Sequence, residues 1–325
     1  MVAAVRVHKH GGPEVLTFED VEVAAPGQGQ VRLKQHACGI NFIDTYFRKG
    51  MYPSPVGLPF VAGNEAAGEV IAVGSGVSDL KMGDRVAYVS ALGGYAAERM
   101  MPAERLVKLP DAISYEQAAG MMLKGMTVQY LLNRTFKVQK GTTLLVHAAA
   151  GGVGQILTQW AHHLGAMVIG TVGSDDKAQI AKANGCDHVI NYSKEDFVAR
   201  VKEITAGKLC DVVYDGVGKN TFPASLDCLR PLGMFASYGS ASGPIEAFNL
   251  NILTQKGSLF ATRPTLNNYT ATREDLLMTA NDLFKVVGSG AVKIPVNQKY
   301  PLKDARKAHE DLESRKTTGS SILIP

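Results

Sequence analysis

The stretch His147-Ala148-Ala149-Ala150-Gly151-Gly152-Val153-Gly154 decides the fold, because it joins an apolar segment at 142–146 to a segment with apolar residues at helical spacing. Small residues in such a strand-to-helix turn let the backbone approach a pyrophosphate, whose charge is stabilised by the free N–H groups at the helix start. Ala149 replaces the first glycine of the G-x-G-x-x-G pattern, so a tight turn without a ligand is the alternative. We predict that Gly154 lets the helix pack closely on the strand, and that a dinucleotide binds at Gly151, Gly152 and Val153.

Strands and helices alternate beyond this turn. Apolar segments typical of buried strands lie at 142–146, 167–171, 188–190, 211–214, 234–237 and 258–262. Between the first two, a predicted helix carries one apolar face, formed by Ile156, Leu157, Trp160, Ala161 and Leu164. Such alternation predicts right-handed βαβ units, and therefore an α/β fold with a doubly wound parallel sheet.

The two ends of the chain show other patterns. Up to about residue 110, short strands at 2–7, 31–37, 69–73 and 85–89 are separated by Gly and Pro, which indicates a small, mainly β domain. Ser114 and Gln117 have the spacing of a capping box at the start of a linking helix. The tail after Pro264 predicts helices at 273–287 and 303–314 and a strand at 321–324, and we expect it to pack on the first domain.

Length and composition exclude several classes of protein. A chain of 325 residues exceeds the usual size of a single core and favours two domains. The absence of an apolar run of about 18 residues and of a secretory signal predicts a soluble, cytoplasmic protein. A net charge of +4 without a basic cluster does not demand nucleic acid as a partner. A disulfide framework and a cysteine-rich zinc site are disfavoured by the scattered positions of Cys38, Cys186, Cys210 and Cys228.

The end of the second predicted strand indicates which dinucleotide binds. An NAD enzyme places a carboxylate about 20 residues after the glycines, where it holds the ribose 2′-OH. This chain has Gly173 and Ser174 there, so nothing acidic at the strand end repels a 2′-phosphate. Ser174 can donate a hydrogen bond, Lys177 a positive charge and Tyr192 a hydroxyl. These residues predict NADPH as the cofactor, although Asp175 and Asp176 leave open that Lys177 is only a solvated surface residue.

Four further motifs lie outside the turn: His8-Lys9-His10-Gly11-Gly12-Pro13-Glu14-Val15, Gly39-Ile40-Asn41-Phe42-Ile43-Asp44-Thr45-Tyr46, Gly63-Asn64-Glu65-Ala66-Ala67-Gly68 and Tyr214-Asp215-Gly216-Val217-Gly218. With them, essentially the whole chain resembles the zinc-free NADPH:quinone reductases, or zeta-crystallin type, of the medium-chain dehydrogenase/reductase superfamily. The resemblance implies a GroES-like, mainly β catalytic domain at 1–124 and 265–325 and a Rossmann NADPH-binding domain at 125–264. It also implies an active site in the cleft between them.

The resemblance also bears on metal binding. Relatives that use catalytic zinc, the alcohol dehydrogenases, have Cys and His ligands where this chain has Asn41 and Asn64, and a third ligand segment that falls at about Leu123. Amides and leucine are poor ligands for zinc. We therefore predict a zinc-free enzyme. Without a Lewis acid to polarise an alcohol, the reduction of an electrophilic acceptor is the favoured reaction.

The resemblance places the segment from Asn41 to Tyr46 beside the nicotinamide. Asn41 and Tyr46 are the candidates for positioning the acceptor, and all four of Asn41, Phe42, Asp44 and Tyr46 are candidates for contact with the cofactor. The alternative for Asn41 and Asp44 is that they only cap a local turn. Other cofactor candidates lie on the linking helix, at the ends of the fifth and sixth strands and near the C-terminus: Thr127, Tyr130, Tyr238, Gly239, Phe260, Thr262, Arg263 and Arg315. A plain surface role for Arg315 is left open.

Three functions remain from these observations. The first is reduction of quinones by NADPH, and the second is reduction of enones or alkenals on the same scaffold. The third is a binding role, as an NADPH-binding or RNA-binding crystallin-like protein, which the weak net charge disfavours. A homodimer is expected from the resemblance alone.

Overall fold

The computed structural model describes all 325 residues, and these form two compact units. The first unit contains Met1–Met126, Thr270–Gly288 and Ile294–Pro325, and the second contains Thr127–Tyr269 and Ser289–Lys293. The predicted domain limits differ from these units by two residues at the first boundary and five at the second, and by the short piece Ser289–Lys293.

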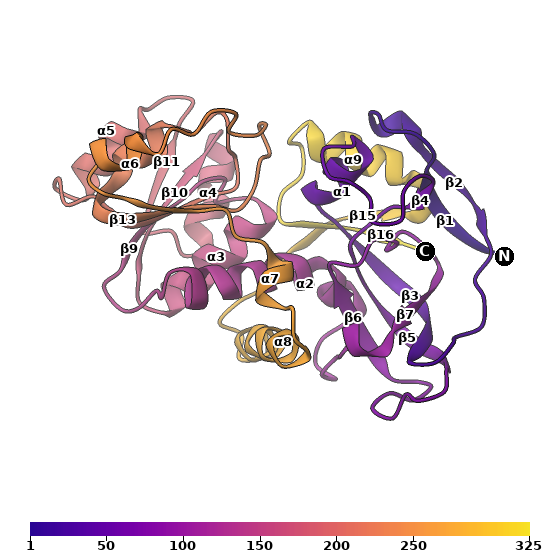
Figure 1. Ribbon diagram of the computed structural model, residues 1–325. Helices are drawn as coiled ribbons and strands as arrows, with labels where there is room; N and C mark the ends of the chain where they lie inside the picture. Colours follow the sequence, from indigo (N-terminus) through magenta and orange to yellow (C-terminus); the bar gives the residue numbers. More distant parts are fainter. The chain divides into compact units, whose positions relative to one another are not determined.

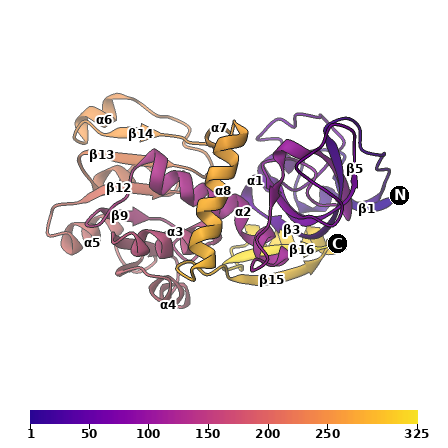
Figure 2. The same cartoon turned by 90° about the horizontal axis from the view of Figure 1, so that it is seen from below.

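The second unit is built on a six-stranded parallel sheet. Its order is β11-β10-β9-β12-β13-β14, so the chain reverses its direction across the sheet beside β9, the strand that precedes the glycine-rich turn. Figure 2 shows β9, β12, β13 and β14 side by side. The strands are β9 (Thr143–Val146), β10 (Met167–Val172), β11 (His188–Asn191), β12 (Cys210–Asp215), β13 (Leu229–Ser237) and β14 (Phe260–Thr262). This arrangement confirms the predicted doubly wound fold.

Helices pack on this sheet through apolar side chains. They are α3 (Gly152–His163), α4 (Asp175–Ala183) and α5 (Phe197–Ile204), with short α6 (Asn251–Gln255) and α7 (Leu266–Tyr269) further along. On α3, the buried face contains Ile156, Leu157, Trp160 and Ala161, as the sequence predicts, whereas Leu164 is half-buried and caps the helix. The core of this unit includes Leu145, Ile169, Val213 and Phe235.

The first unit contains two β-sheets. The larger has seven strands in the order β15-β16-β3-β5-β6-β8, with β7 also paired to β3, and the smaller has the order β2-β1-β4. The larger is formed by β3 (Gln30–Ile40), β5 (Glu65–Val73), β6 (Arg85–Val89), β7 (Glu98–Pro102), β8 (Val107–Lys108), β15 (Val296–Pro301) and β16 (Ser320–Ile324). The smaller is formed by β1 (Val2–Val7), β2 (Leu16–Val21) and β4 (Phe60–Val61).

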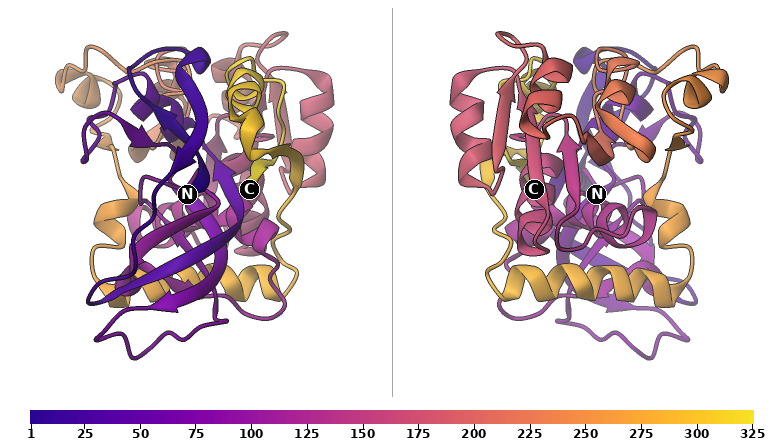
Figure 3. Two further views of the ribbon diagram at one scale, coloured as in Figure 1. Left: turned by 90° about the vertical axis from the view of Figure 1, so that its right-hand side faces the viewer. Right: turned by 90° about the vertical axis from the view of Figure 1, so that its left-hand side faces the viewer.

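Segments far apart in sequence lie together in this unit. The C-terminal strand β16 is antiparallel to β3, and Ser321 pairs with Ile40, the residue before Asn41. Figures 1 and 3 show the yellow C-terminal elements against the indigo and purple N-terminal ones. The helices are α1 (Phe42–Arg48), α8 (Arg273–Gly288), α9 (Ala305–Glu313) and most of α2 (Tyr115–Tyr130). The C-terminal tail therefore packs beside the segment predicted to face the acceptor.

The structure refines several predicted elements. The capping box of α2 is present, since the backbone N–H of Gln117 donates to Ser114 Oγ and that of Ser114 to Gln117 Oε1. The helix α1, which follows Asn41, was not predicted, because it is too short for its periodicity to show. Strand β15 was missed because its polar and apolar residues mix. Phe260 opens β14 and does not end it, and Thr262 and Arg263 alone stand at its carboxyl end.

No helix of the structure is both long and apolar enough to cross a membrane. All four cysteines are buried and unpaired, as expected from their scattered positions.

Candidate active site

The glycine-rich turn in the second unit has the geometry of a phosphate-binding turn. Gly151 is the N-cap of α3 and provides no side-chain cap, so the first N–H groups of this 12-residue helix are left for a ligand. A Cβ on Gly154 would lie 2.3 Å from the carbonyl oxygen of Ala148. The glycine is thus required by contact with the turn and not, as predicted, with the strand. Ala148 takes the left-handed conformation, with φ of 56°, that glycine adopts at lower cost.

A buried network of polar side chains holds this turn in place. His147 Nδ1 lies 2.9 Å from Thr171 Oγ1, and its Nε2 lies 3.0 Å from Ser225 Oγ. Ser225 donates to Asp215 Oδ2, so its oxygen accepts from His147 Nε2–H, and Nδ1 accepts from Thr171. Burial lowers the pKa of His147, which keeps the ring neutral. This network, which sequence reasoning missed, ties together the carboxyl ends of β9, β10 and β12.

The residues predicted to bind the 2′-phosphate gather at the carboxyl ends of β10 and β11. Ser174 is the N-cap of α4, and its Oγ accepts the backbone N–H of Lys177 at 3.4 Å. The Tyr192 hydroxyl lies 2.6 Å from where a Cβ on Gly173 would be. The structure therefore brings Gly173, Ser174, Lys177 and Tyr192 to one edge of the sheet, beside the N-terminus of a helix.

The candidates from the later strands lie along the same edge. Tyr238 and Gly239 follow β13, and the Tyr238 ring lies 2.9 Å from a Cβ position on Gly216. Arg263, after β14, donates to the carbonyl oxygen of Ser237 at 2.9 Å. Phe260 is 58% exposed at the start of the edge strand β14, three residues before Arg263.

On α2, Thr127 and Tyr130 are buried, and the Tyr130 ring stacks on Tyr269 with centroids 4.3 Å apart. Burial raises the pKa of the Tyr130 phenol, against the effect of its hydrogen bond with Thr127. Thr127 and Tyr130 are therefore held as one rigid pair. Arg315, in the first unit, is exposed after α9 with φ of 60°.

In the first unit, Asn41 is the N-cap of α1. Its backbone N–H donates to Asp44 Oδ2 at 2.8 Å, and its side-chain Nδ2 donates to Glu65 Oε2 at 2.7 Å. Glu65 is fully buried, accepts the backbone N–H of Leu123, and lies 3.7 Å from Lys124 Nζ. Burial raises the pKa of Glu65, and the nearby Lys124 ammonium opposes this rise. The amide of Asn41 is thus fixed by a buried carboxylate.

Asp44 is also buried, with 1% of its surface exposed. Its Oδ1 accepts from Asn64 Nδ2 at 2.8 Å, and its Oδ2 accepts from the Tyr95 hydroxyl at 2.9 Å. Burial raises the pKa of Asp44 to about 6, although these hydrogen bonds oppose the rise. At the positions where the resemblance places zinc ligands, Asn41 and Asn64 thus present N–H donors to carboxylates, and Leu123 presents its backbone N–H.

Two tyrosines meet beside α1. The rings of Tyr46 and Tyr52 are arranged edge to face with centroids 5.4 Å apart, and the backbone N–H groups of Met51 and Tyr52 reach the carbonyl oxygen of Tyr46. Sequence reasoning missed Tyr52. The signal available in the sequence was an aromatic residue in the short Met51-Tyr52-Pro53 segment, which closely follows Tyr46.

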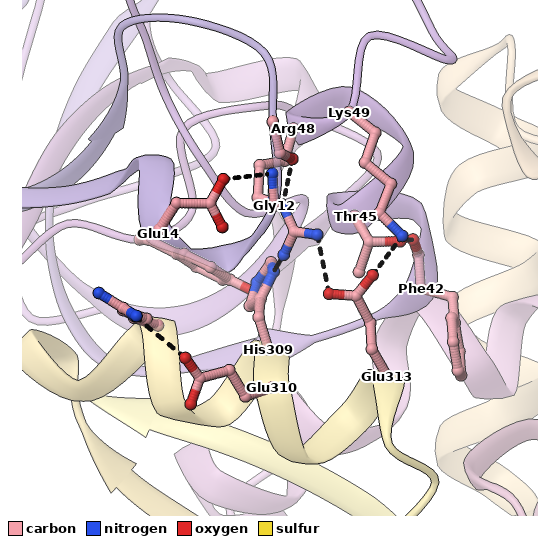
Figure 4. A network of polar contacts seen from close by, with 12 residues as sticks. Gly12, Glu14, Phe42, Thr45, Arg48, Lys49, His309, Glu310 and Glu313 are labelled. Carbon is pink, nitrogen blue, oxygen red and sulfur yellow. Dashed lines mark hydrogen bonds and ion pairs between the residues drawn. The ribbon is translucent and has the colours of Figure 1, made fainter.

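The far end of α1 is clamped by the C-terminal helix. Arg48 is fully buried and donates to His309 Nδ1 at 2.8 Å, to Glu313 Oε2 at 2.8 Å and to the carbonyl oxygen of Gly11 at 3.1 Å. Figure 4 shows Arg48 between His309 and Glu313, with Lys49 reaching the same carboxylate.

The hydrogen-bond directions in this clamp follow from arginine being a donor only. His309 Nδ1 must accept from Arg48, so the neutral ring carries its proton on Nε2, 3.0 Å from the Tyr95 hydroxyl. Tyr95 then accepts from His309 and donates to Asp44. Burial, with the adjacent Arg48 charge, lowers the pKa of His309 to about 3. One neutral side chain on α9 therefore links the two ends of α1.

A Rossmann sheet with a glycine-rich turn, together with a β domain that carries α1, defines a medium-chain dehydrogenase/reductase. A family model for the alcohol dehydrogenase GroES-like domain matches residues 27–111, and one for zinc-binding dehydrogenases matches residues 152–275. The second description names zinc, whereas the match covers none of Asn41, Asn64 and Leu123.

Comparison with individual relatives identifies the family within this class. A quinone oxidoreductase from Salmonella typhimurium is 54% identical over 328 residues, covering all of both chains. The crystal structure of Escherichia coli quinone oxidoreductase complexed with NADPH has a TM-score of 0.97 and 52% identity, covering 99% of this chain and 100% of that one. A 2-haloacrylate reductase from a Burkholderia species is 48% identical, covering 100% of this chain and 99% of that protein. The chain belongs to the quinone oxidoreductase family of the medium-chain dehydrogenases/reductases.

Proposed function

We propose that this chain reduces quinones with NADPH and uses no metal ion. The observation that carries the proposal is the group formed by Gly173, Ser174, Lys177 and Tyr192, which offers a serine hydroxyl, a lysine and a helix N-terminus where a carboxylate would select NADH. The relative of known structure that is named as a complex with NADPH supports the same cofactor.

The second unit is suited to bind a dinucleotide because its backbone N–H groups can donate hydrogen bonds to phosphates. The uncapped start of α3 offers N–H groups to a diphosphate, and the His147 network keeps the turn in place before the cofactor arrives. Thr127, Tyr130, Tyr238, Gly239, Thr262 and Arg263 are proposed as further contacts on this unit, with Phe260 and Arg315 as the least supported of the set.

Bound NADPH would supply the reducing electrons, as a hydride or singly. The residues of α1 would then position the acceptor. Tyr46 and Tyr52, whose rings meet edge to face, would supply aromatic area to a flat acceptor, and a phenol O–H can donate a hydrogen bond to a developing quinol oxygen. Asn41, anchored by Glu65, and Phe42 would fix the orientation, while Asp44 acts through Asn41 because its oxygens are already occupied.

The absence of zinc is proposed from the chemistry of the donors. A metal ion needs lone pairs, and Asn41 and Asn64 turn N–H groups toward buried carboxylates that hold them in that orientation. Lys124 places a positive charge beside Glu65, so this carboxylate has a cation near it without a metal.

A second function has its own support. The relative named 2-haloacrylate reductase is 48% identical over essentially the whole chain, so an activated alkene is a credible acceptor for the same scaffold. Location in the cytoplasm, assembly as a homodimer and a minor role in RNA binding all remain predictions.

Steady-state NADPH oxidation separates the two acceptor classes. We expect kcat/KM to be at least about tenfold higher for simple 1,4-quinones than for enones and 2-haloacrylates of similar size. The reverse order would replace the proposed function by the alkene reductase. Retention of labelled RNA at physiological salt would support the binding role.

A further inference from the structure

The 2′-phosphate region contains a carboxylate that ought to disfavour NADPH. Asp175 is the first residue of α4, directly after the N-cap Ser174, and is therefore one residue from a proposed phosphate contact. A free carboxylate here would repel a 2′-phosphate, and it could accept a hydrogen bond from the 2′-OH of NADH. The lack of an acid at the strand end is thus only part of the explanation for the predicted selectivity.

The loop after β11 holds this carboxylate by both oxygens. Asn191 Nδ2 donates to Asp175 Oδ1 at 2.9 Å, and Lys194 Nζ donates to Asp175 Oδ2 at 2.5 Å. Asn191 is only 7% exposed, and its own Oδ1 accepts the backbone N–H of Ser193 at 3.1 Å. The neighbouring Asp176 is exposed and has no part in this arrangement.

The same loop is joined to the cofactor side in a second way. Ser193 Oγ donates to the carbonyl oxygen of Gly173 at 3.0 Å, and the backbone N–H of Tyr192 donates to that of Val172 at 3.1 Å. The two loops are therefore joined at Gly173 and Val172, and this keeps the backbone of Lys194 close to the start of α4, although the ion pair itself is solvent-exposed. The Lys194 and Asn191 contacts also lower the pKa of Asp175, which shows that they favour its charged form.

We infer that Lys194 and Asn191 are specificity-determining residues, which neutralise and hold Asp175 so that it neither repels the 2′-phosphate of NADPH nor binds the 2′-OH of NADH. The inference rests on the proposed cofactor site at Ser174 and Lys177. The charges on α4 and in the loop after β11 are Lys177, Lys182 and Lys194 against Asp175, Asp176 and Asp196, while Glu195 is paired with Arg200.

The test is a double-mutant cycle read by dissociation constants of NADPH and NADH at low salt. Lys194→Ala should weaken NADPH binding roughly three- to tenfold and leave NADH binding unchanged or tighter. Asp175→Asn alone should change NADPH binding less than about twofold, because the charge it removes is already neutralised. Combined with Lys194→Ala, it should recover most of the lost NADPH affinity, since no carboxylate then remains to be released.

Two controls make the result specific. Lys182→Ala removes an equal charge from the last turn of the same helix and should leave both constants unchanged. Asp176→Asn removes an acid that no partner holds in this arrangement, and should tighten NADPH binding more than Asp175→Asn does.

The inference is overturned if Lys194→Ala behaves like Lys182→Ala, or if Asp175→Asn restores nothing, since Lys194 would then contact the phosphate directly. Loss of NADPH affinity in Lys177→Ala separates this outcome from failure of the proposed site. If Lys177→Ala has no effect, the 2′-phosphate does not bind here and the underlying proposal fails first.

Discussion

The candidate cofactor region of the second unit and the candidate acceptor region of the first unit are built in opposite ways. The candidate cofactor region uses short, contiguous segments: the backbone of the turn at 147–154, and the loops after β10 and β11 with the side chains of Ser174, Lys177 and Tyr192. The acceptor region on α1 depends on side chains from distant parts of the chain, and Arg48 meets His309 across 261 positions. A site formed by contiguous segments leaves a local pattern in the sequence, whereas side-chain contacts between distant segments leave none.

Gly154→Val should damage the cofactor region most. Its branched side chain would meet the Ala148 carbonyl oxygen, which is backbone and cannot move away, so we expect about 3 kcal/mol of lost stability and loss of NADPH binding. Thermal unfolding and NADPH titration measure both. Gly151→Ala is the matched control, because its Cβ would lie 3.2 Å from the same oxygen; it should fold nearly normally and bind NADPH more weakly. Equal stability of the two variants would contradict the close packing described here.

His309→Phe should damage the acceptor region without touching the cofactor region. It leaves a buried Arg48 N–H without an acceptor and the buried Tyr95 oxygen without a donor, at about 1–3 kcal/mol each, and loosens both ends of α1. We expect kcat/KM for a quinone to fall about tenfold or more, with the NADPH dissociation constant unchanged. His309→Gln can still accept from Arg48 and donate to Tyr95, and should recover much of the activity. Equal loss in both variants would show that only packing matters.

Tyr46→Phe should cost roughly 1–2 kcal/mol in kcat/KM, because water can also protonate a reduced quinone. Tyr46→Ala should lose more, since it removes the ring that meets Tyr52. The measurement is kcat/KM with one quinone for both variants. Abolished turnover in Tyr46→Phe, with NADPH binding intact, would make Tyr46 an essential acid and contradict this assignment.

Acid should weaken the clamp through His309. The pKa of His309 is about 3 in the folded protein and near 6.5 in the unfolded chain. Between these two pH values the unfolded chain therefore binds more protons than the folded protein. The contribution of His309 to stability is thus complete above pH 6.5 and is lost as the pH falls toward 3. Asp44 acts in the opposite sense: its pKa is about 6 in the fold and 3.8 unfolded, so its contribution is complete below pH 3.8 and lost as pH rises through 6.

Denaturant unfolding at pH 7 and pH 5 measures the balance. His309→Gln should lose less stability than the wild type between these two values, because it removes the histidine and keeps Asp44. His163→Gln, at an exposed histidine on α3, is the control and should behave as the wild type does. A larger acid loss in His309→Gln would reverse the sign derived above.

Exhaustive chelation should have the smallest effect, namely none on activity. The amides of Asn41 and Asn64 donate to buried carboxylates, and on this basis we propose that no metal ion binds there. Stoichiometric zinc that leaves together with activity would refute the zinc-free proposal.

The local part of the fold was predictable from sequence. The strand-to-helix turn, the order of alternating elements and the capping box at Ser114 and Gln117 depend on neighbouring residues and were found. The helix α1 and strand β15 were not, because seven and six residues respectively give too little periodicity.

The long-range part of the site could not be found in this way. The chain from Arg48 through His309 and Tyr95 to Asp44 joins three separate segments, namely α1, α9 and the loop that carries Tyr95, and the His147 network joins three strand ends. Each link is a side-chain contact between segments whose proximity only the folded sheet order creates. Asp44 illustrates the consequence: the resemblance named it as a candidate for cofactor contact, whereas its burial and its contacts with Asn64 and Tyr95 depend on the folded structure.

The most direct test of the account is the NADPH dissociation constant of Lys177→Ala beside that of Tyr46→Ala. The account predicts that Lys177→Ala binds NADPH at least about tenfold more weakly, because a lysine contact with the 2′-phosphate is lost, while Tyr46→Ala binds it as the wild type does. An unchanged constant for Lys177→Ala would contradict the assignment of the 2′-phosphate site to the carboxyl ends of β10 and β11.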